Sequence, residues 1–176
     1  MTYTDTKLAV PYFSQYRDIR DADHRLRGCG MTSTYMVLKY FGADVSSLDD
    51  ETEKGMAEGG FGPSGWYHDY FVKLFRSYGF PCERREHLRE REVADFRESL
   101  KTGNPVIISV VRRLWDQRLF HMVVLTGYRE DEKGNLLGFF YHDPASMRED
   151  GSQHLYVDLS VFFLDWRGMA IFPRKS

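Results

Sequence analysis

The chain has little cysteine and lacks any apolar run long enough to cross a membrane. Cys29 and Cys82 are the two cysteines among 176 residues, which excludes the disulfide framework that staples many small secreted domains. Residues 1–10 contain no apolar segment after a basic cluster, so no secretory signal is visible. We therefore expect a cytoplasmic protein whose thiols are reduced.

The chain also lacks an excess of charge of either sign. Its 24 basic and 26 acidic side chains give a net charge of -2, and the pI is about 6.3. The arginines of residues 84–100 alternate with glutamates and form no basic run. These features argue against nucleic acid or an anionic membrane as a partner.

Motifs for phosphate and metal binding are missing as well. The glycine-rich stretch 58–65 does not end in the Gly-Lys-Ser/Thr of a phosphate-binding loop, and we interpret residues 44–65 as a flexible connection. Neither Cys82 nor the histidines have the spacing of metal ligands. We expect no metal and no cofactor.

What the chain does contain is enough apolar material for one sizeable core. It is 42% hydrophobic and 15% aromatic, as a globular protein with a rigid interior would be. No internal repeat and no linker composition interrupts it. The sequence predicts a single domain over residues 1–176.

Helical periodicity is concentrated in the first half. Met31, Tyr35 and Leu38 recur at helical spacing after Cys29, and Gly42 is suited to end that helix. No acidic residue lies in this segment, so the helix should be buried. The elements expected in this half are an edge strand at 8–13, a loop at 16–27, and helices at 29–41, 66–78 and 84–100.

The second half has the pattern of strands. Residues 105–111 and 120–127 are continuous apolar runs rich in β-branched side chains, as buried strands are. Residues 131–135 have the composition of a hairpin turn. Helices followed by antiparallel strands indicate an α+β fold. The expected strands are 80–83, 105–111, 120–127, 136–141, 155–157 and 168–172, and 161–166 is ambiguous between helix and strand.

Cys29 is the first candidate for chemistry. It lies between Gly28 and Gly30 at the start of a predicted helix, where the positive end of the helix dipole lowers the pKa of a thiol. The two glycines would allow a substrate backbone to approach the sulfur closely. Trp66, beside the glycine-rich stretch, could line the same groove or pack in the core.

A nucleophilic thiol needs a base, and the base needs a group that orients it. His121 begins an apolar strand and Asp143 ends the next one, so antiparallel pairing would bring the two side chains together. An oxyanion could accept hydrogen bonds from the Cys29 backbone N–H and from the side-chain amide of Gln15. The predicted catalytic set is Gln15, Cys29, His121 and Asp143.

Short motifs containing these residues extend from Val10 to Ile171. They are VPYFSQ, GCGMTS opening a helix that ends YFG, GNPVIISV, HMVVLTGY and YHDP. In this order they resemble the papain-like cysteine peptidases related to the double-glycine leader peptidases, which process bacteriocins. The resemblance implies a papain-like fold, with the nucleophile at the start of a central helix that packs on an antiparallel sheet.

Carried over residue by residue, the resemblance implies that Cys29 is the nucleophile, His121 the general base and acid, and Asp143 the orienting group. It implies Gln15 as the oxyanion-hole donor. The chain departs from the family pattern at Met31, because proline commonly follows Cys-Gly in these relatives. No ATP-binding transporter domain follows the motifs, so we expect a stand-alone bacterial relative.

Several other residues invite a plainer interpretation. We expect Cys82 to be a structural or partly exposed thiol. His142 precedes Asp143 and should point to the opposite face of the strand, at the surface. Trp115 and Trp166 are expected in the core or in the walls of a cleft.

We therefore expect a peptidase that hydrolyses a peptide or amide bond through a thioester, acting on a peptide or protein. The same acyl-enzyme could pass its acyl group to an amine or thiol, which would make the protein an acyl- or peptidyl-transferase. A non-catalytic binding module with the same fold is a second alternative. Redox sensing through Cys29 and Cys82 is a third, disfavoured by the distance between them in the chain.

Overall fold

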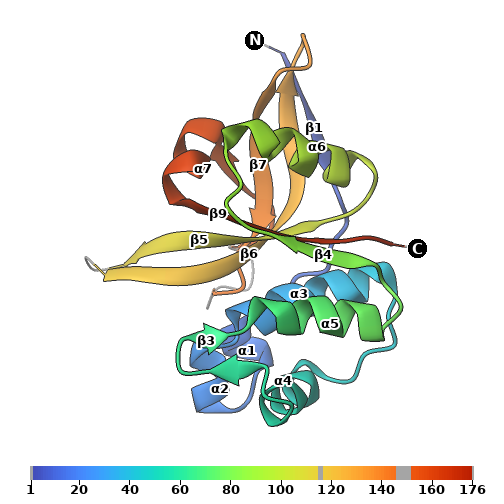
Figure 1. Cartoon of the computed structure of the whole chain (residues 1–176). Coiled ribbons are helices and arrows are strands. Elements are labelled where there is room, and N and C mark those ends of the chain that lie inside the picture. The colour runs from blue at the N-terminus through green and yellow to red at the C-terminus, as the bar shows by residue number, and fades with distance from the viewer. Residues whose placement is uncertain (1, 115–116, 146–151, 176) are drawn as a thin grey trace.

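An antiparallel sheet separates two layers of helices (Figure 1). The computed structural model describes residues 2–114, 117–145 and 152–175, without the side chains of residues 112–119. Helices α1 to α5 lie below the sheet in the view of Figure 1, and α6 and α7 lie above it. This arrangement confirms the predicted α+β class.

The elements have the following bounds. The helices are α1 (Gln15–Asp18), α2 (Ala22–Leu26), α3 (Cys29–Phe41), α4 (Leu48–Ala57), α5 (His68–Ser77), the 3-10 turn η1 (Glu90–Glu92), α6 (Val93–Lys101) and α7 (Leu159–Asp165). The strands are β1 (Tyr3–Lys7), β2 (Phe61–Gly62), β3 (Gly65–Trp66), β4 (Cys82–Arg85), β5 (Val106–Leu114), β6 (Gln117–Asp131), β7 (Leu136–His142), β8 (Leu155–Asp158) and β9 (Trp166–Pro173).

The main sheet has the order β4-β9-β5-β6-β7-β8, and β1 pairs with the outer part of β6. β6 changes neighbours along its length: it pairs with β5 up to Val106↔Leu125, and with β1 from Lys7↔Gly127 onward. β7 joins β6 at Val124↔His142 and ends there. The residue that follows β7, Asp143, therefore leaves the sheet next to the part of β6 that carries His121.

Alternation along the strands gives each face of the sheet its own hydrophobic cluster. Ile107, Met122 and Val124 point toward α3 and α5, where they join the larger cluster. Ile108 and Val123 point toward α6 and α7 and join the second cluster. The sheet is thus buried on both faces, which explains the continuous apolar runs in its sequence.

The predicted helix from Cys29 to Phe41 is confirmed as α3. Its side chains from Gly30 to Leu38 are all buried, as the lack of acidic residues indicated. Gly42 ends the helix in the left-handed conformation, with φ 84°, and its backbone N–H donates to the carbonyl oxygens of Leu38 and Lys39.

Two predictions about the N-terminal region are wrong. Residues 8–13 form no strand; the edge strand is β1, where a bidentate ion pair joins Asp5 to Arg129 at 2.6 and 2.9 Å. Residues 16–27 are not a plain loop, because α1 and α2 form there. Their side-chain caps, Ser14 and Asp21, satisfy backbone N–H groups at each helix start.

Two further predictions fail in the middle of the chain. Residues 44–65 are ordered as α4, capped by Ser47, and as the first part of the β2–β3 hairpin, so they are not a flexible connection. Residues 84–100 do not form one helix. Their first residues, Arg84 and Arg85, continue β4 and pair with β9, so α6 begins only at Val93.

In the ambiguous segment at 161–166, residues 161–165 belong to α7, and Trp166 begins β9. Trp115 lies outside the described residues. Within the described parts of the chain, no helix is both long enough and apolar enough to cross a membrane.

Candidate active site

The site begins with the thiol of Cys29, which is half-buried at the first residue of α3. Both neighbouring glycines are buried, and both are required by packing. A Cβ atom at Gly30 would lie 2.5 Å from Cζ of Phe71, and one at Gly28 would collide with Ile19. The glycines therefore let the start of α3 approach α5 and the segment after α1. Gly30 also borders the groove described below, whereas Gly28 does not.

His121 is held in place by Asp143. The imidazole, on β6, is 7% exposed, and its Nε2 lies 2.7 Å from Oδ1 of Asp143. The same carboxylate oxygen accepts the backbone N–H of Ala145 at 2.8 Å. The hydroxyl of Tyr12 donates to the Asp143 carbonyl oxygen at 2.9 Å. The N-terminal segment and the end of β7 thus fix the carboxylate that orients the ring.

The side chains of Cys29 and His121 are hydrogen-bonded to each other. Because Nε2 faces Asp143, the nitrogen left for the thiol is Nδ1. The predicted three residues therefore come together, although α3 and the two strands are far apart in the chain.

The electrostatics of this pair favour charge separation. Burial alone would raise the pKa of the Cys29 thiol, but the His121 hydrogen bond and charge, helped by hydrogen bonds with the backbone of Met122 and Gly30, hold the pKa below its usual value. Burial would likewise lower the pKa of His121, yet the hydrogen bonds to Asp143 and Cys29 raise that pKa to about 9. A thiolate beside an imidazolium is the state that these shifts stabilise.

Gln15 packs beside Gly28, the residue before Cys29. It is 3% exposed, and its side-chain amide donates to the carbonyl oxygen of Arg25 at 2.8 Å. Its Oε1 atom is buried without a hydrogen-bond partner in the described part of the chain. The amide is therefore held beside the segment that leads into Cys29.

A groove of about 620 Å³ opens in front of the thiol. Trp66, predicted as a groove or core residue, lies on its wall, and its indole N–H donates to the carbonyl oxygen of Arg27 at 2.8 Å. Phe61 from β2 meets Trp66 edge to face. Phe120 and Arg167 form part of the opposite wall. Neither Phe61, Phe120 nor Arg167 belongs to a motif, so sequence reasoning missed them.

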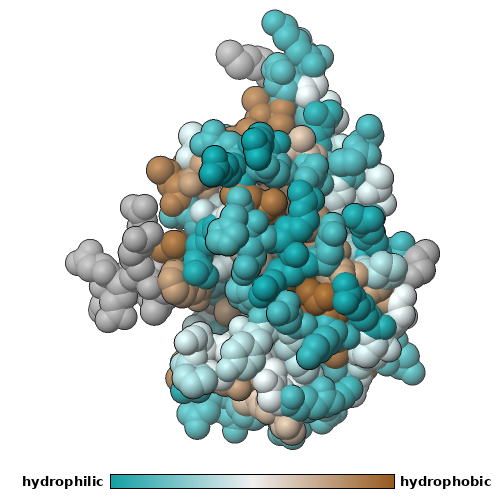
Figure 2. Space-filling view, viewed as in Figure 1, coloured by the Kyte–Doolittle hydropathy of each residue, from teal (hydrophilic) through white to brown (hydrophobic). Residues whose placement is uncertain are grey.

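A second, smaller cavity of about 240 Å³ lies on the other face of the sheet. His121 and Asp143 reach it together with apolar side chains, among them Val110 and Phe162. Apolar residues gather on the surface over α7, next to this cavity (Figure 2). The imidazole of His121 thus borders both the groove and this cavity.

Cys82 and His142, for which no catalytic role was predicted, differ in their surroundings. Cys82 is buried, and burial raises the pKa of its thiol to about 12, as befits a structural cysteine. The prediction that His142 lies at the surface is wrong: it is fully buried, because the N-terminal segment covers that face of β7. Its Nε2–H donates to the Val10 carbonyl oxygen at 2.9 Å.

Trp166 packs in the second cluster against Phe162. Among the described residues, no group of His, Cys, Asp and Glu side chains is placed to hold a metal ion.

A thiol at the start of a helix that packs on an antiparallel sheet, with a histidine on that sheet, defines the fold class of the papain-like cysteine peptidases. The model of the "Peptidase_C39 like family" matches residues 7–170. The chain belongs to this family, and it is a cysteine peptidase.

Two solved structures illustrate the likeness. One is a double glycine motif protease from an AMS/PCAT transporter in complex with the leader peptide, which is 18% identical with a TM-score of 0.61, over 97% of this chain and 94% of that one. The other is the peptidase domain of Streptococcus ComA, a bifunctional ABC transporter involved in quorum sensing, at 17% identity and a TM-score of 0.59 over 92% and 99%. At these identities the likeness shows the fold alone. Among curated protein sequences there is no match.

Proposed function

We propose that Cys29, His121 and Asp143 form the catalytic triad of this cysteine peptidase. The observation that carries the proposal is the contact in which His121 Nε2 lies 2.7 Å from Asp143 Oδ1, while the imidazole shares the groove with the Cys29 thiol, whose pKa it lowers. The orientation of the base by a carboxylate and the lowered thiol pKa are what a nucleophilic cysteine requires.

The chemistry follows from this geometry. The Cys29 thiolate attacks the carbonyl carbon of the scissile bond, and the tetrahedral intermediate collapses with loss of the C–N bond. The imidazolium of His121 gives its proton to the leaving nitrogen, so that an amine departs and a thioester remains. The neutral imidazole then takes a proton from water, whose oxygen attacks the thioester and releases the acid and the thiolate.

The oxyanion of each tetrahedral intermediate needs hydrogen-bond donors. We assign this role to the backbone N–H of Cys29, at the start of α3, and to the side-chain amide of Gln15. The bond to the Arg25 carbonyl oxygen engages one N–H of the Gln15 amide and fixes its direction. The second N–H remains for the oxyanion.

The substrate in this proposal is a peptide that lies in the groove of about 620 Å³ in front of Cys29. The double glycine motif protease with its bound leader peptide is a neighbour of similar fold. By analogy, we propose cleavage after a pair of small residues such as Gly-Gly.

Thiol labelling tests the triad without knowledge of the substrate. Iodoacetamide at mildly acidic pH should modify Cys29 at least about tenfold faster than Cys82, because only the thiol of Cys29 has a lowered pKa. His121→Ala should slow the labelling of Cys29, and Cys82→Ser should leave the labelling of Cys29 unchanged. Equal and slow labelling of both thiols would refute the proposed triad.

A further inference from the structure

The groove in front of Cys29 has an unusual charge. Besides the Cys29–His121 pair, its charged lining residues are Arg27 and Arg167; His68 lines it as well, whereas no carboxylate of the described residues does. The chain as a whole carries a net charge of -2. A groove that is cationic in a slightly acidic protein favours an anionic group in its ligand.

Arg167 is held in a defined position at the wall of this groove. It extends from β9, and its Nη1 donates to Oγ of Ser109, on β5, at 3.0 Å. Its guanidinium carbon lies 3.5 Å from the centre of the Phe120 ring. The hydrogen bond to Ser109 and the stacking on the Phe120 ring fix the plane of the guanidinium. Its other N–H groups have no hydrogen-bond acceptor among the described residues.

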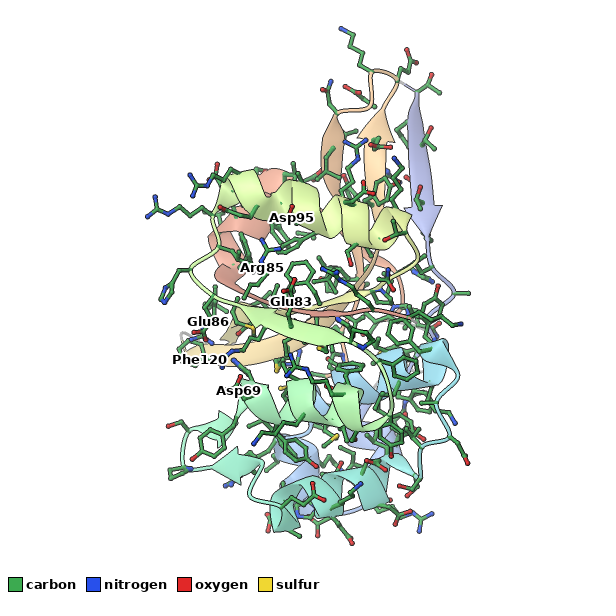
Figure 3. All side chains as sticks on the ribbon, turned by 45° about the vertical axis from the view of Figure 1, so that its right-hand side comes forward. Asp69, Glu83, Arg85, Glu86, Asp95 and Phe120 are labelled. Carbon is green, nitrogen blue, oxygen red and sulfur yellow. The ribbon has the colours of Figure 1, made fainter. Side chains whose placement is uncertain are left out.

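Another arginine of this region, Arg84, differs from Arg167 in its ion pairs. On β4, Arg84 contacts Asp69 at 3.4 Å and Glu86 at 3.7 Å. Asp69 and Glu86 lie toward the same side of the molecule as Phe120 (Figure 3). These carboxylates are therefore already engaged by Arg84, whereas no carboxylate of the described residues pairs with Arg167.

Arg27 completes the arrangement from the other wall. Its guanidinium lies 5.2 Å from the centre of the Phe61 ring, and its backbone carbonyl oxygen accepts the Trp66 indole N–H. It precedes Cys29 by two residues and lines the same groove, so a peptide bound at the thiol can also meet Arg27. Each arginine is thus placed against an aromatic ring at the edge of the same groove.

We propose that Arg167, assisted by Arg27, makes this peptidase selective for peptides that carry a carboxylate close to the scissile bond. A planar guanidinium stacked on a ring binds a carboxylate edge-on with two parallel hydrogen bonds. The carboxylate is either the side chain of an Asp or Glu or the free C-terminus of the peptide. This inference rests on the proposed function of Cys29, and it names the substrate class of that site.

The test uses peptides with a central Gly-Gly pair in which Glu is placed at each flanking position in turn, each with a Gln-containing twin. If a side-chain carboxylate is recognised, kcat/KM for the Glu peptide should exceed that for its Gln twin by about tenfold or more at one or more positions. Arg167→Gln should reduce that ratio to near one, and Arg167→Lys should restore part of it. Arg174→Gln is the matched control, because it removes the same charge just after β9 at a residue that does not line the groove.

A second set of peptides separates the two sources of the carboxylate. Amidation of the C-terminus should leave kcat/KM unchanged if a side chain is recognised. If the chain end is recognised, amidation should lower kcat/KM of the wild type but not that of Arg167→Gln. Arg167→Glu should turn the preference toward peptides with Lys at the same position.

The outcomes distinguish this inference from the proposed function. Equal cleavage of Glu and Gln peptides by the wild type together with no loss of cleavage on amidation of the C-terminus, or a carboxylate preference that survives in Arg167→Gln, overturns the selectivity while leaving the triad intact. If the wild type cleaves no peptide and Cys29 labels no faster than Cys82, both proposals are overturned.

Discussion

Two thiols of the same chain have opposite electrostatic surroundings. Cys82, the first residue of β4, is packed in the cluster on the α5 side of the sheet, and burial raises the pKa of its thiol to about 12. Cys29 is hydrogen-bonded to His121, which lowers its pKa despite the cost of burial. The difference comes from one imidazole and from the Asp143 carboxylate that holds it.

These shifts predict the pH dependence of peptide cleavage. The thiolate is lost at acidic pH, and because the pKa of Cys29 is lowered, this loss occurs below the usual thiol range. The imidazolium of His121, with a pKa of about 9 against the ordinary 6.5, is lost as pH rises through about 9. A profile of kcat/KM against pH should therefore rise as the Cys29 thiol ionises, at a pH below the usual thiol range, and fall as pH rises through about 9. A rate that keeps rising above pH 9 would contradict the role of His121 as the acid.

A substitution of Gln15 can separate two contributions to catalysis, which are the stabilisation of the oxyanion and the activation of the Cys29 thiol. Gln15→Ala should lower kcat by about a hundredfold or more, because a donor to the oxyanion is lost. The rate of Cys29 alkylation should be unchanged, because alkylation forms no oxyanion. A parallel loss of both rates would show that Gln15 acts by supporting the fold, and a thermal melt would detect that loss of stability.

The sequence context identified some residues of the site and not others. Cys29 begins a recognisable helix, His121 lies at the start of an apolar run within β6, and Asp143 follows β7, so their meeting could be predicted. Arg167 lies on the last strand, 138 residues after Cys29 by their numbers, and only the pairing of β9 with β5 brings it to the groove. No sequence motif around Arg167 identifies it as a residue of the site.

At the scale of elements, prediction succeeded where one face is plainly apolar. α3 was predicted to the residue, whereas α4 was missed. The buried positions of α4 have helical spacing, but they are Leu48, Glu51, Thr52 and Gly55. Glu51 is tolerated there because its carboxylate accepts hydrogen bonds from Ser46 at 2.6 Å and Tyr78 at 2.7 Å. Such partners come from other elements, so a hydrophobic pattern could not reveal this helix.

The start of α3 should tolerate no side chain at Gly30. Gly30→Ala would place a Cβ atom 2.5 Å from the Phe71 ring and 2.9 Å from Sδ of Met122. We expect a loss of about 1–3 kcal/mol in the free energy of unfolding and slower alkylation of Cys29, because the helix start must shift. Urea denaturation measures the first effect. Lys39→Ala, at an exposed position of the same helix, is the matched control and should change neither quantity.

The end of β7 should make the protein sensitive to acid through His142. Nδ1 of this ring accepts the His154 backbone N–H at 3.0 Å, so protonation there breaks a hydrogen bond. Burial lowers the pKa of His142 to about 4, below the ordinary 6.5. Between these values the unfolded chain binds a proton that the folded chain does not.

The free energy of unfolding should therefore fall by roughly 3 kcal/mol from this group as pH drops from 6.5 to 4. Urea denaturation of the wild type and of His142→Gln at several pH values measures it. The variant should be the less stable protein at pH 7, and the difference should narrow toward pH 4. A difference that is constant with pH would disprove the assignment.

At the scale of the whole molecule, the sheet divides the interior into two hydrophobic clusters, one on each of its faces. The cluster on the α3 side includes Met31 and Phe71 and supports the nucleophile. The cluster on the α6 and α7 side is centred on Phe96, which is fully buried. The α+β class follows from the order of helices and strands in the sequence, but the order of strands within the sheet depends on long-range pairing that no local pattern specifies.

This division predicts that stability can be lowered without damage to the site. Phe96→Ala removes a ring that packs against Phe139, Phe162, Trp166 and Phe172. It should cost about 3–5 kcal/mol in the free energy of unfolding. Well below the melting temperature, the labelling rate of Cys29 should match that of the wild type. A large change in that rate would mean that the two faces are coupled through the sheet.

The position of His121 between two cavities has a consequence for inhibition. The cavity of about 240 Å³ on the far face of the sheet reaches the imidazole and the Asp143 carboxylate and does not include Cys29. A small apolar compound bound there would disturb the base while the groove stayed free for peptide. Such a compound would act as a noncompetitive inhibitor, and an excess of substrate would not displace it.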